Sequence, residues 1–245
     1  ADVAQVSASG LRALHCAARA GPVKAVEQLL IAKADPCAAH AIEGVLPVEL
    51  ISTLRTQQAY RVHELLCART KQEAPASGWL SKLGGQRKVW RRRYFLLTTT
   101  DPVCHGQLRY YADESLTYLH GAIDLRGVLP DHITAPSRSS DLAGNEPQAV
   151  AKRELSFDLR TAARTYVLVA ANLEEYGTWL DMLRLLFVRT ISLQIKEITS
   201  TGEAATGSGT SEASFAAGMV DARAWVEHLA VPSAESRVTL AHGAH

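Results

Sequence analysis

The sequence predicts an α+β chain with more than one domain, in which helical hairpins precede a small antiparallel β-barrel or sandwich closed by a helix. Three observations predict this fold class. A helix–turn–helix pattern recurs after about 33 residues in the first part of the chain. Short segments of alternating apolar and polar side chains then occupy residues 77–171. An apolar stripe with helical spacing follows them.

The composition is that of an ordinary globular protein. The 245 residues are 47% hydrophobic and 21% charged, which suffices for one or two buried cores. Lysine and arginine number 26 and aspartate and glutamate 25, so the formal net charge is +1. This balance gives no general reason to expect a nucleic acid partner, and we predict none. Attraction to an anionic ligand must come from a local cluster of charge.

The cysteines and the hydropathy indicate where the protein works. Four cysteines stand far apart and form no CxxC pair, which favours a reduced, cytoplasmic protein. No run approaches the ~18 apolar residues that a membrane-spanning helix needs, so membrane association is expected to be peripheral. The chain begins at Ala1 and not at methionine, from which we expect it to be a piece of a longer protein.

The first part of the chain contains two copies of a helical hairpin. In the first copy, Gly21-Pro22 separates two short helical patterns. The second copy starts at Gly44 and is weaker, and its residues 52–59 are lengthened and polar. Arrays of this kind usually need about three units for a stable core. Either further sequence upstream or packing against the following domain should therefore complete the core.

Both copies resemble the ankyrin repeat. The second copy keeps Pro47 but has Glu49 in place of the signature's histidine. The resemblance implies that residues 1–72 hold about two ankyrin repeats, the second degenerate, which bind a protein partner of unknown identity. The matching residues of the first copy are Gly10, Ala13-Leu14-His15, Ala17-Ala18, Gly21, Leu29-Leu30 and Ala34-Asp35.

Six later segments have the alternation of successive antiparallel strands. A helix should follow them, because Asn172 can cap its first turn with Glu175 three residues on, and its apolar stripe begins at Tyr176. We expect two interruptions, a long turn at residues 98–106 and a mobile insertion rich in Pro, Ser and Gly at residues 130–153. The strand segments are GWLSKL, WRRRYFLL, QLRYY, GAIDL, ELSFDL and TYVLVA.

Positive charge is concentrated on the first predicted strand hairpin, which contains no acidic residue. The six cations between residues 79 and 100 are Lys82, Arg87, Lys88, Arg91, Arg92 and Arg93. Because side chains alternate along a strand, Arg91 and Arg93 share one face and Arg92 points to the other. Gly84-Gly85 permits a tight connection to the strand of Lys82. Guanidinium groups bind phosphate oxygens bidentately and an ammonium adds a compact charge, so the hairpin predicts a site for a multiply phosphorylated headgroup.

The strands and the helix together are similar to the pleckstrin-homology (PH) domain, over residues 77–189. The resemblance implies a seven-stranded antiparallel β-barrel or sandwich capped by a C-terminal α-helix, with Trp179 at the position of the family's characteristic tryptophan. It rests on the segments SGWLSKLGGQRKVWRRRYFLL, LRYY, HGAIDL, FDLRTAARTYVLVAAN and YGTWLDML.

The pattern of Lys82, Arg91 and Arg93 is similar to that of family members that bind 3-phosphorylated inositol lipids. The resemblance implies that Lys82 and Arg93 hold the central phosphates. Tyr110 either donates its hydroxyl group to the ligand or packs within its strand pair, and His120 stands where those members carry arginine. The predicted phosphoinositide-binding residues are Lys82, Lys88, Arg91, Arg93, Tyr110 and His120.

Other notable residues are expected to serve the fold. His15, beside Cys16, should make a structural hydrogen bond at the hairpin turn. No cysteines, histidines or carboxylates have the spacing of a metal site, and no GxxxxGK or GxSxG motif occurs. We therefore predict no catalytic residue, metal or cofactor. The residues expected in the core of the β domain include Trp90, Tyr94, Trp179 and Leu180.

The sequence predicts a non-enzymatic adaptor that binds phosphoinositide lipids on an anionic membrane surface through one domain and a protein partner through the other. Two alternatives stay open. The β domain binds a protein without specific lipid binding, or the chain is the targeting half of a larger signalling or lipid-transfer protein similar to oxysterol-binding-protein relatives. The predicted parts are hairpins at 1–72, a polar linker at 70–77, the PH domain at 77–189, a flexible linker at 190–214 and a short amphipathic helix and tail at 215–245.

Overall fold

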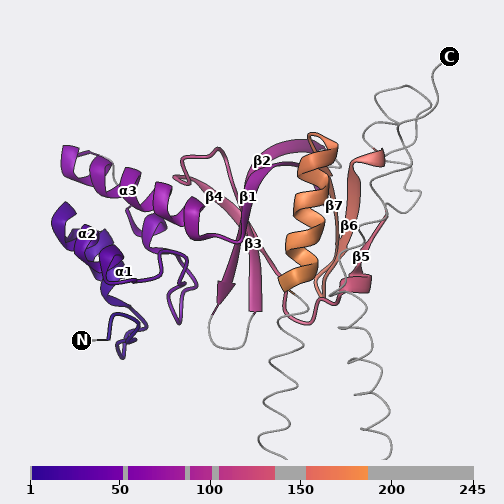
Figure 1. The fold of residues 1–245 in the computed structure, drawn as a ribbon. Coiled ribbons are helices and arrows are strands. Elements are labelled where there is room, and N and C mark those ends of the chain that lie inside the picture. Colours follow the sequence, from indigo (N-terminus) through magenta and orange to yellow (C-terminus); the bar gives the residue numbers. More distant parts are fainter. Residues whose placement is uncertain (1, 52–54, 86–88, 101–104, 136–152, 187–245) are drawn as a thin grey trace, which may run out of the picture. The chain divides into compact units, whose positions relative to one another are not determined.

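Figure 1 shows the fold in a computed structural model, in which the helices α1–α3 precede a seven-stranded sheet. The structure describes residues 2–51, 55–85, 89–100, 105–135 and 153–186. The predicted linker at 190–214 and the predicted helix at 215–245 lie outside the described residues.

The first helical hairpin forms as predicted. Helices α1 (Ala13–Ala20) and α2 (Val23–Ile31) are separated by Gly21-Pro22, because proline lacks the N–H group that would continue α1. His15 is fully buried, and its Nε2 lies 3.2 Å from the carbonyl oxygen of Val45. Burial lowers the pKa of this imidazole. The structural hydrogen bond predicted for His15 is thus confirmed.

The second hairpin departs from the first. Its first helix is only the 3-10 turn η1 (Pro47–Leu50), whereas its second is the long helix α3 (Gln57–Glu73). Thr56 caps α3, because its hydroxyl oxygen accepts a hydrogen bond of 3.1 Å from the backbone N–H of Ala59. The weaker repeat pattern therefore corresponds to one lost helix and one lengthened helix.

The polar linker predicted at residues 70–77 is wrong. Helix α3 continues to Glu73 and strand β1 begins at Ala76, so two residues join them. The cause is the burial of Thr70, which has no exposed surface. Its carbonyl oxygen accepts a hydrogen bond from Sγ of Cys37 at 3.4 Å. The last turn of α3 is held by the first hairpin.

The seven strands form one antiparallel sheet in the order β4-β3-β2-β1-β7-β6-β5. Its central strand β1 pairs with β2 on one side and β7 on the other, so that Lys82 stands opposite both Arg91 and Leu168. The strands are β1 (Ala76–Leu83), β2 (Trp90–Thr100), β3 (His105–Tyr111), β4 (Leu119–Asp124), β5 (Ile133–Thr134), β6 (Ser156–Arg160) and β7 (Thr165–Ala170).

The start of the insertion predicted to be mobile is packed. It supplies the 3-10 turn η2 (Pro130–His132) and strand β5, which pairs with β6. Pro130 and Ile133 are buried there, which explains why these residues are ordered. Residues 136–152 lie outside the described residues.

One face of the sheet packs against a helix at residues 173–186, drawn in orange in Figure 1. Asn172 caps this helix as predicted, because its Oδ1 accepts a hydrogen bond of 2.8 Å from the backbone N–H of Glu175. Trp179 and Leu180 belong to the buried core, as expected. Trp90 does not and is only half-buried, because it pairs with Leu83 at the last position of the β1–β2 ladder, where less of the sheet covers it.

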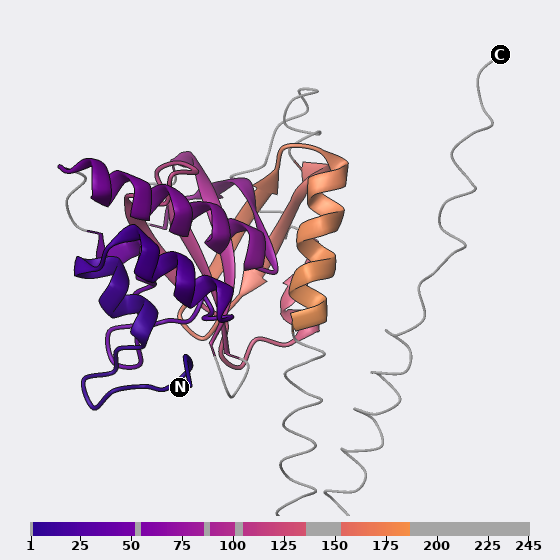
Figure 2. The ribbon, with the colours of Figure 1, turned by 60° about the vertical axis from the view of Figure 1, so that its left-hand side comes forward.

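The opposite face of β2 and β3 is covered by the N-terminal segment, residues 2–51 and 55–73. Tyr94, Leu96 and Tyr111 form one buried cluster with side chains of α1, α2 and α3 such as Leu14 and Leu66. Figures 1 and 2 show the three helices beside the strands β1–β4, on the side away from the orange helix. Packing against the following domain therefore completes the core of the helical hairpins.

A buried ion pair joins the N-terminal segment to the sheet. Nη1 of Arg109 on β3 donates to both carboxylate oxygens of Glu49 at 3.0 Å, and the two side chains are 3% and 7% exposed. The hydroxyl of Tyr111 and the backbone N–H of Leu46 also donate to this carboxylate. Glu49, which replaces the histidine of the repeat signature, therefore holds the second hairpin on the sheet.

Candidate functional site

Three of the predicted cations meet on neighbouring strands. Lys82 on β1 stands opposite Arg91 on β2, and Arg93 follows two residues along the same face. Lys82 is half-buried, and burial lowers the pKa of its ammonium group. The positive charges of Arg164, Arg93 and Arg91 lower this pKa further. Lys82 thus lies in a local field of positive charge.

Arg164 is a fourth cation, which the sequence analysis missed. It ends the turn between β6 and β7, and its Cζ lies 4.2 Å from the centre of the Tyr166 ring. A Cβ atom at position 85 would overlap the Arg164 guanidinium, so Gly85 leaves room for it beside the β1–β2 turn. We call Lys82, Arg91, Arg93 and Arg164 the basic cluster.

The signal that could have found Arg164 is the antiparallel pairing of the first and last strands. Because β1 pairs with β7, the turn before β7 lies at the same end of the sheet as the turn after β1. The basic residue in the segment TAARTY therefore belongs with the cations of the first hairpin.

Tyr110 lies beneath Lys82. The ammonium nitrogen of Lys82 is 4.6 Å from the centre of the Tyr110 ring, a cation–π contact that holds the lysine side chain over the sheet. Gly121 on β4 makes room for the ring, because a Cβ atom there would lie 2.5 Å from the Tyr110 hydroxyl oxygen. Burial, and then Tyr166, raises the pKa of Tyr110, so its hydroxyl stays a hydrogen-bond donor.

The remaining predicted residues lie elsewhere. Arg92 points to the opposite face, as alternation predicts, and its Cζ lies 4.6 Å from the centre of the Trp79 ring. His120 is exposed on the edge strand β4. Among the described residues, the groups that perturb the pKa values of Lys82 and Tyr110 do not include His120. Lys88 lies outside the described residues.

Two simple alternatives to an anion site find no support in the part of the chain that the structure describes. There, no group of three or more histidine, cysteine and carboxylate side chains could hold a metal ion. None of the helices in the same residue ranges is both long and apolar enough to cross a membrane.

Residues 76–186 match the model of the PH domain family, and this segment is a PH domain. The Pleckstrin homology domain-containing protein 1 of Arabidopsis thaliana is 29% identical over 105 residues, which are 43% of this chain. The chain spans 63% of the length of that relative.

Solved structures of PH domains are also similar to this chain. The C-terminal PH domain of human pleckstrin is 30% identical, with a TM-score of 0.36, and the match covers 48% of this chain and 89% of that domain. The same pleckstrin domain in complex with D-myo-Ins(1,2,3,4,5)P5 is 29% identical, with a TM-score of 0.33, and the match covers 45% of this chain and 95% of that one.

Proposed function

We propose that the PH domain binds the phosphorylated headgroups of phosphoinositide lipids, with 3-phosphorylated inositol lipids as the first candidates. The observation that supports this most is the basic cluster, in which four cations from β1, β2 and the β6–β7 turn converge. Among the described residues, none of the four pairs with a carboxylate. Uncompensated positive charge of this density is stabilised by an anion that carries several phosphate groups.

Each member of the basic cluster has a chemical role in this proposal. The guanidinium groups of Arg91, Arg93 and Arg164 can each donate two parallel hydrogen bonds to phosphate oxygens. The ammonium of Lys82, held on the Tyr110 ring, adds a point charge between them. The Tyr110 hydroxyl supplies a neutral donor.

Replacing Arg93 by alanine should weaken the binding of a soluble inositol polyphosphate roughly ten- to hundredfold, because a hydrogen bond to a charged group contributes about 1.5–3 kcal/mol. Arg92→Ala is the matched control, since it removes the same charge from the same strand on the opposite face and should change the affinity much less. Isothermal titration calorimetry, with polyphosphates that do and do not carry a phosphate at position 3, measures both effects and the positional preference.

Two outcomes would contradict the proposal. Equal losses in Arg92→Ala and Arg93→Ala would mean that net charge and not the basic cluster attracts the ligand. The absence of binding to any inositol polyphosphate by the parent chain would favour a PH domain that docks a protein.

Headgroup binding should take up protons in alkaline solution. Burial and the neighbouring cations lower the pKa of Lys82 in the free protein, whereas a bound phosphate would raise it again. Between about pH 8 and pH 10, binding therefore protonates part of the Lys82 population, and the affinity falls as the pH rises. Calorimetry in two buffers of different ionisation enthalpy measures the uptake. Lys82→Arg should abolish it because guanidinium stays charged, and the same uptake in this variant would contradict the assignment.

The N-terminal segment supports the second half of the proposal. Its first hairpin carries the ankyrin-type residues, with His15 bonded to the backbone of Val45, and we propose that residues 1–72 are ankyrin repeats that bind a protein partner. The whole chain would then be a non-enzymatic, cytoplasmic adaptor with peripheral attachment to a membrane. A screen for partners of the parent chain, repeated with exposed residues of α2 and α3 substituted, would test this half separately.

A further inference from the structure

Two exposed arginines of the N-terminal segment lie close together. Arg19 ends α1, Arg55 precedes α3, and both side chains line one open hollow of about 210 Å³ with Thr56. Both arginines are exposed, and among the described residues neither pairs with a carboxylate. The amino-terminal end of the 17-residue helix α3, at Thr56, adds partial positive charge at the same place.

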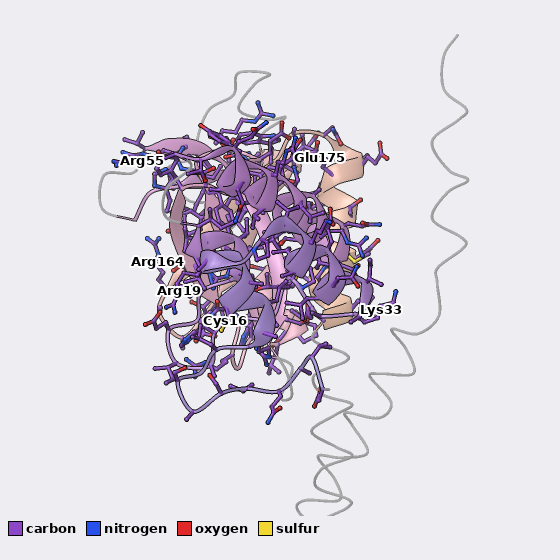
Figure 3. The ribbon with its side chains drawn as sticks, turned by 90° about the vertical axis from the view of Figure 1, so that its left-hand side faces the viewer. Cys16, Arg19, Lys33, Arg55, Arg164 and Glu175 are labelled. Atoms are coloured by element: carbon purple, nitrogen blue, oxygen red, sulfur yellow. The ribbon has the colours of Figure 1, made fainter. Side chains whose placement is uncertain are left out.

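These arginines face the same side of the molecule as the basic cluster. In Figure 3 the side chains of Arg19 and Arg55 lie along the left-hand side, and so does Arg164 of the basic cluster. Residues along one edge of a projection share a plane that is seen edge-on, whatever their depth in the view. One flat surface can therefore approach all three guanidinium groups together, whereas Lys33 lies on the opposite side.

We infer that the membrane-contact surface extends beyond the PH domain onto the N-terminal segment, with Arg19 and Arg55 resting on an anionic lipid surface while the basic cluster holds the headgroup. The inference rests on the proposed function. Attraction of this kind is delocalised and acts only within a Debye length of about 10 Å, so it requires charges on the side that faces the bilayer. It does not require a pocket around either arginine.

The test compares three exposed single-charge variants of the full chain, Arg19→Gln, Arg55→Gln and the control Lys33→Gln. Binding is measured to phosphatidylcholine vesicles that carry phosphatidylserine and a small fraction of a 3-phosphorylated inositol lipid. A basic residue near an anionic bilayer contributes a factor of roughly five to binding. We expect about fivefold weaker binding for each arginine variant and none of this loss for Lys33→Gln.

Two further measurements identify the source of the effect. Without phosphatidylserine, the losses should largely disappear, because only the headgroup contact remains. Affinity for the soluble inositol polyphosphate should be unchanged in all three variants, and thermal melting should show that each stays folded.

The possible results separate the two proposals. If the parent binds the vesicles and the arginine variants bind them as tightly, the N-terminal segment does not touch the bilayer and the inference is wrong. If Lys33→Gln loses as much as the arginine variants, the effect is one of net charge and the inference is equally wrong. If the parent itself binds neither the vesicles nor the soluble headgroup, the proposed function fails and the inference fails with it.

Discussion

Replacing Glu49 by alanine should lower the free energy of unfolding by about 3–5 kcal/mol, because it leaves the charge of Arg109 buried without a partner. Arg109 is 3% exposed and donates to both oxygens of the Glu49 carboxylate. The same substitution also removes the acceptor of the Tyr111 hydroxyl, whose pKa is raised by burial and by this carboxylate. Urea unfolding followed by circular dichroism measures the loss.

A double variant separates the charge from the contact. Glu49→Leu combined with Arg109→Met removes both charges and keeps apolar volume, so it should recover most of the stability that the single substitution loses. If Glu49→Ala alone costs less than about 1 kcal/mol, water reaches Arg109 and the ion pair does not join the N-terminal segment to the sheet.

Removing residues 1–75 should leave a PH domain that does not fold as a soluble monomer. Leu96, Tyr111 and Leu116 have no exposed surface in the whole chain and belong to the cluster shared with the N-terminal segment. Burial of each large apolar side chain contributes about 1.5–3 kcal/mol, or roughly 5–9 kcal/mol for the three. This is of the same order as the whole stability of a typical domain, about 5–15 kcal/mol.

Expression and sedimentation of residues 76–189 measure this effect. Residues 1–75 supplied as a separate chain should restore a soluble complex, because the missing surface is noncovalent. A truncated protein that is monomeric and melts at the temperature of the parent would show that the apolar face of β2 and β3 tolerates water.

The sequence predicted local structure well. Alternation identified six of the seven strands, and the capping pattern at Asn172 located the start of the last helix. These features depend on neighbouring residues, so a short stretch of sequence contains the signal. Strand β5 escaped because two residues are too few to show a period.

What the sequence did not predict depends on distant contacts. The linker at residues 70–77 reads as polar and exposed, yet Thr70 is buried by Cys37, which lies 33 residues earlier. Trp90 reads as a core residue, yet its place at the end of a ladder leaves it half-exposed. The pairing of Glu49 with Arg109 spans 60 residues, and no local pattern specifies it.

The candidate site divides in the same way. Lys82, Arg91 and Arg93 could be placed on one face because a single hairpin carries them. Arg164 comes from a turn about 80 residues later and needed the pairing of β1 with β7. Whether Lys88 joins the site remains a prediction from the sequence, and so does the role of His120.

Strand β3 serves two different surfaces with consecutive residues. Tyr110 faces the basic cluster, whereas Arg109 and Tyr111 face the N-terminal segment. A slip of β3 by one residue during folding would exchange these faces, placing an arginine in the apolar core and separating Glu49 from its partner. The ion pair therefore selects the correct strand register as the chain folds, and the N-terminal segment acts as a template for the sheet on which the headgroup site is built.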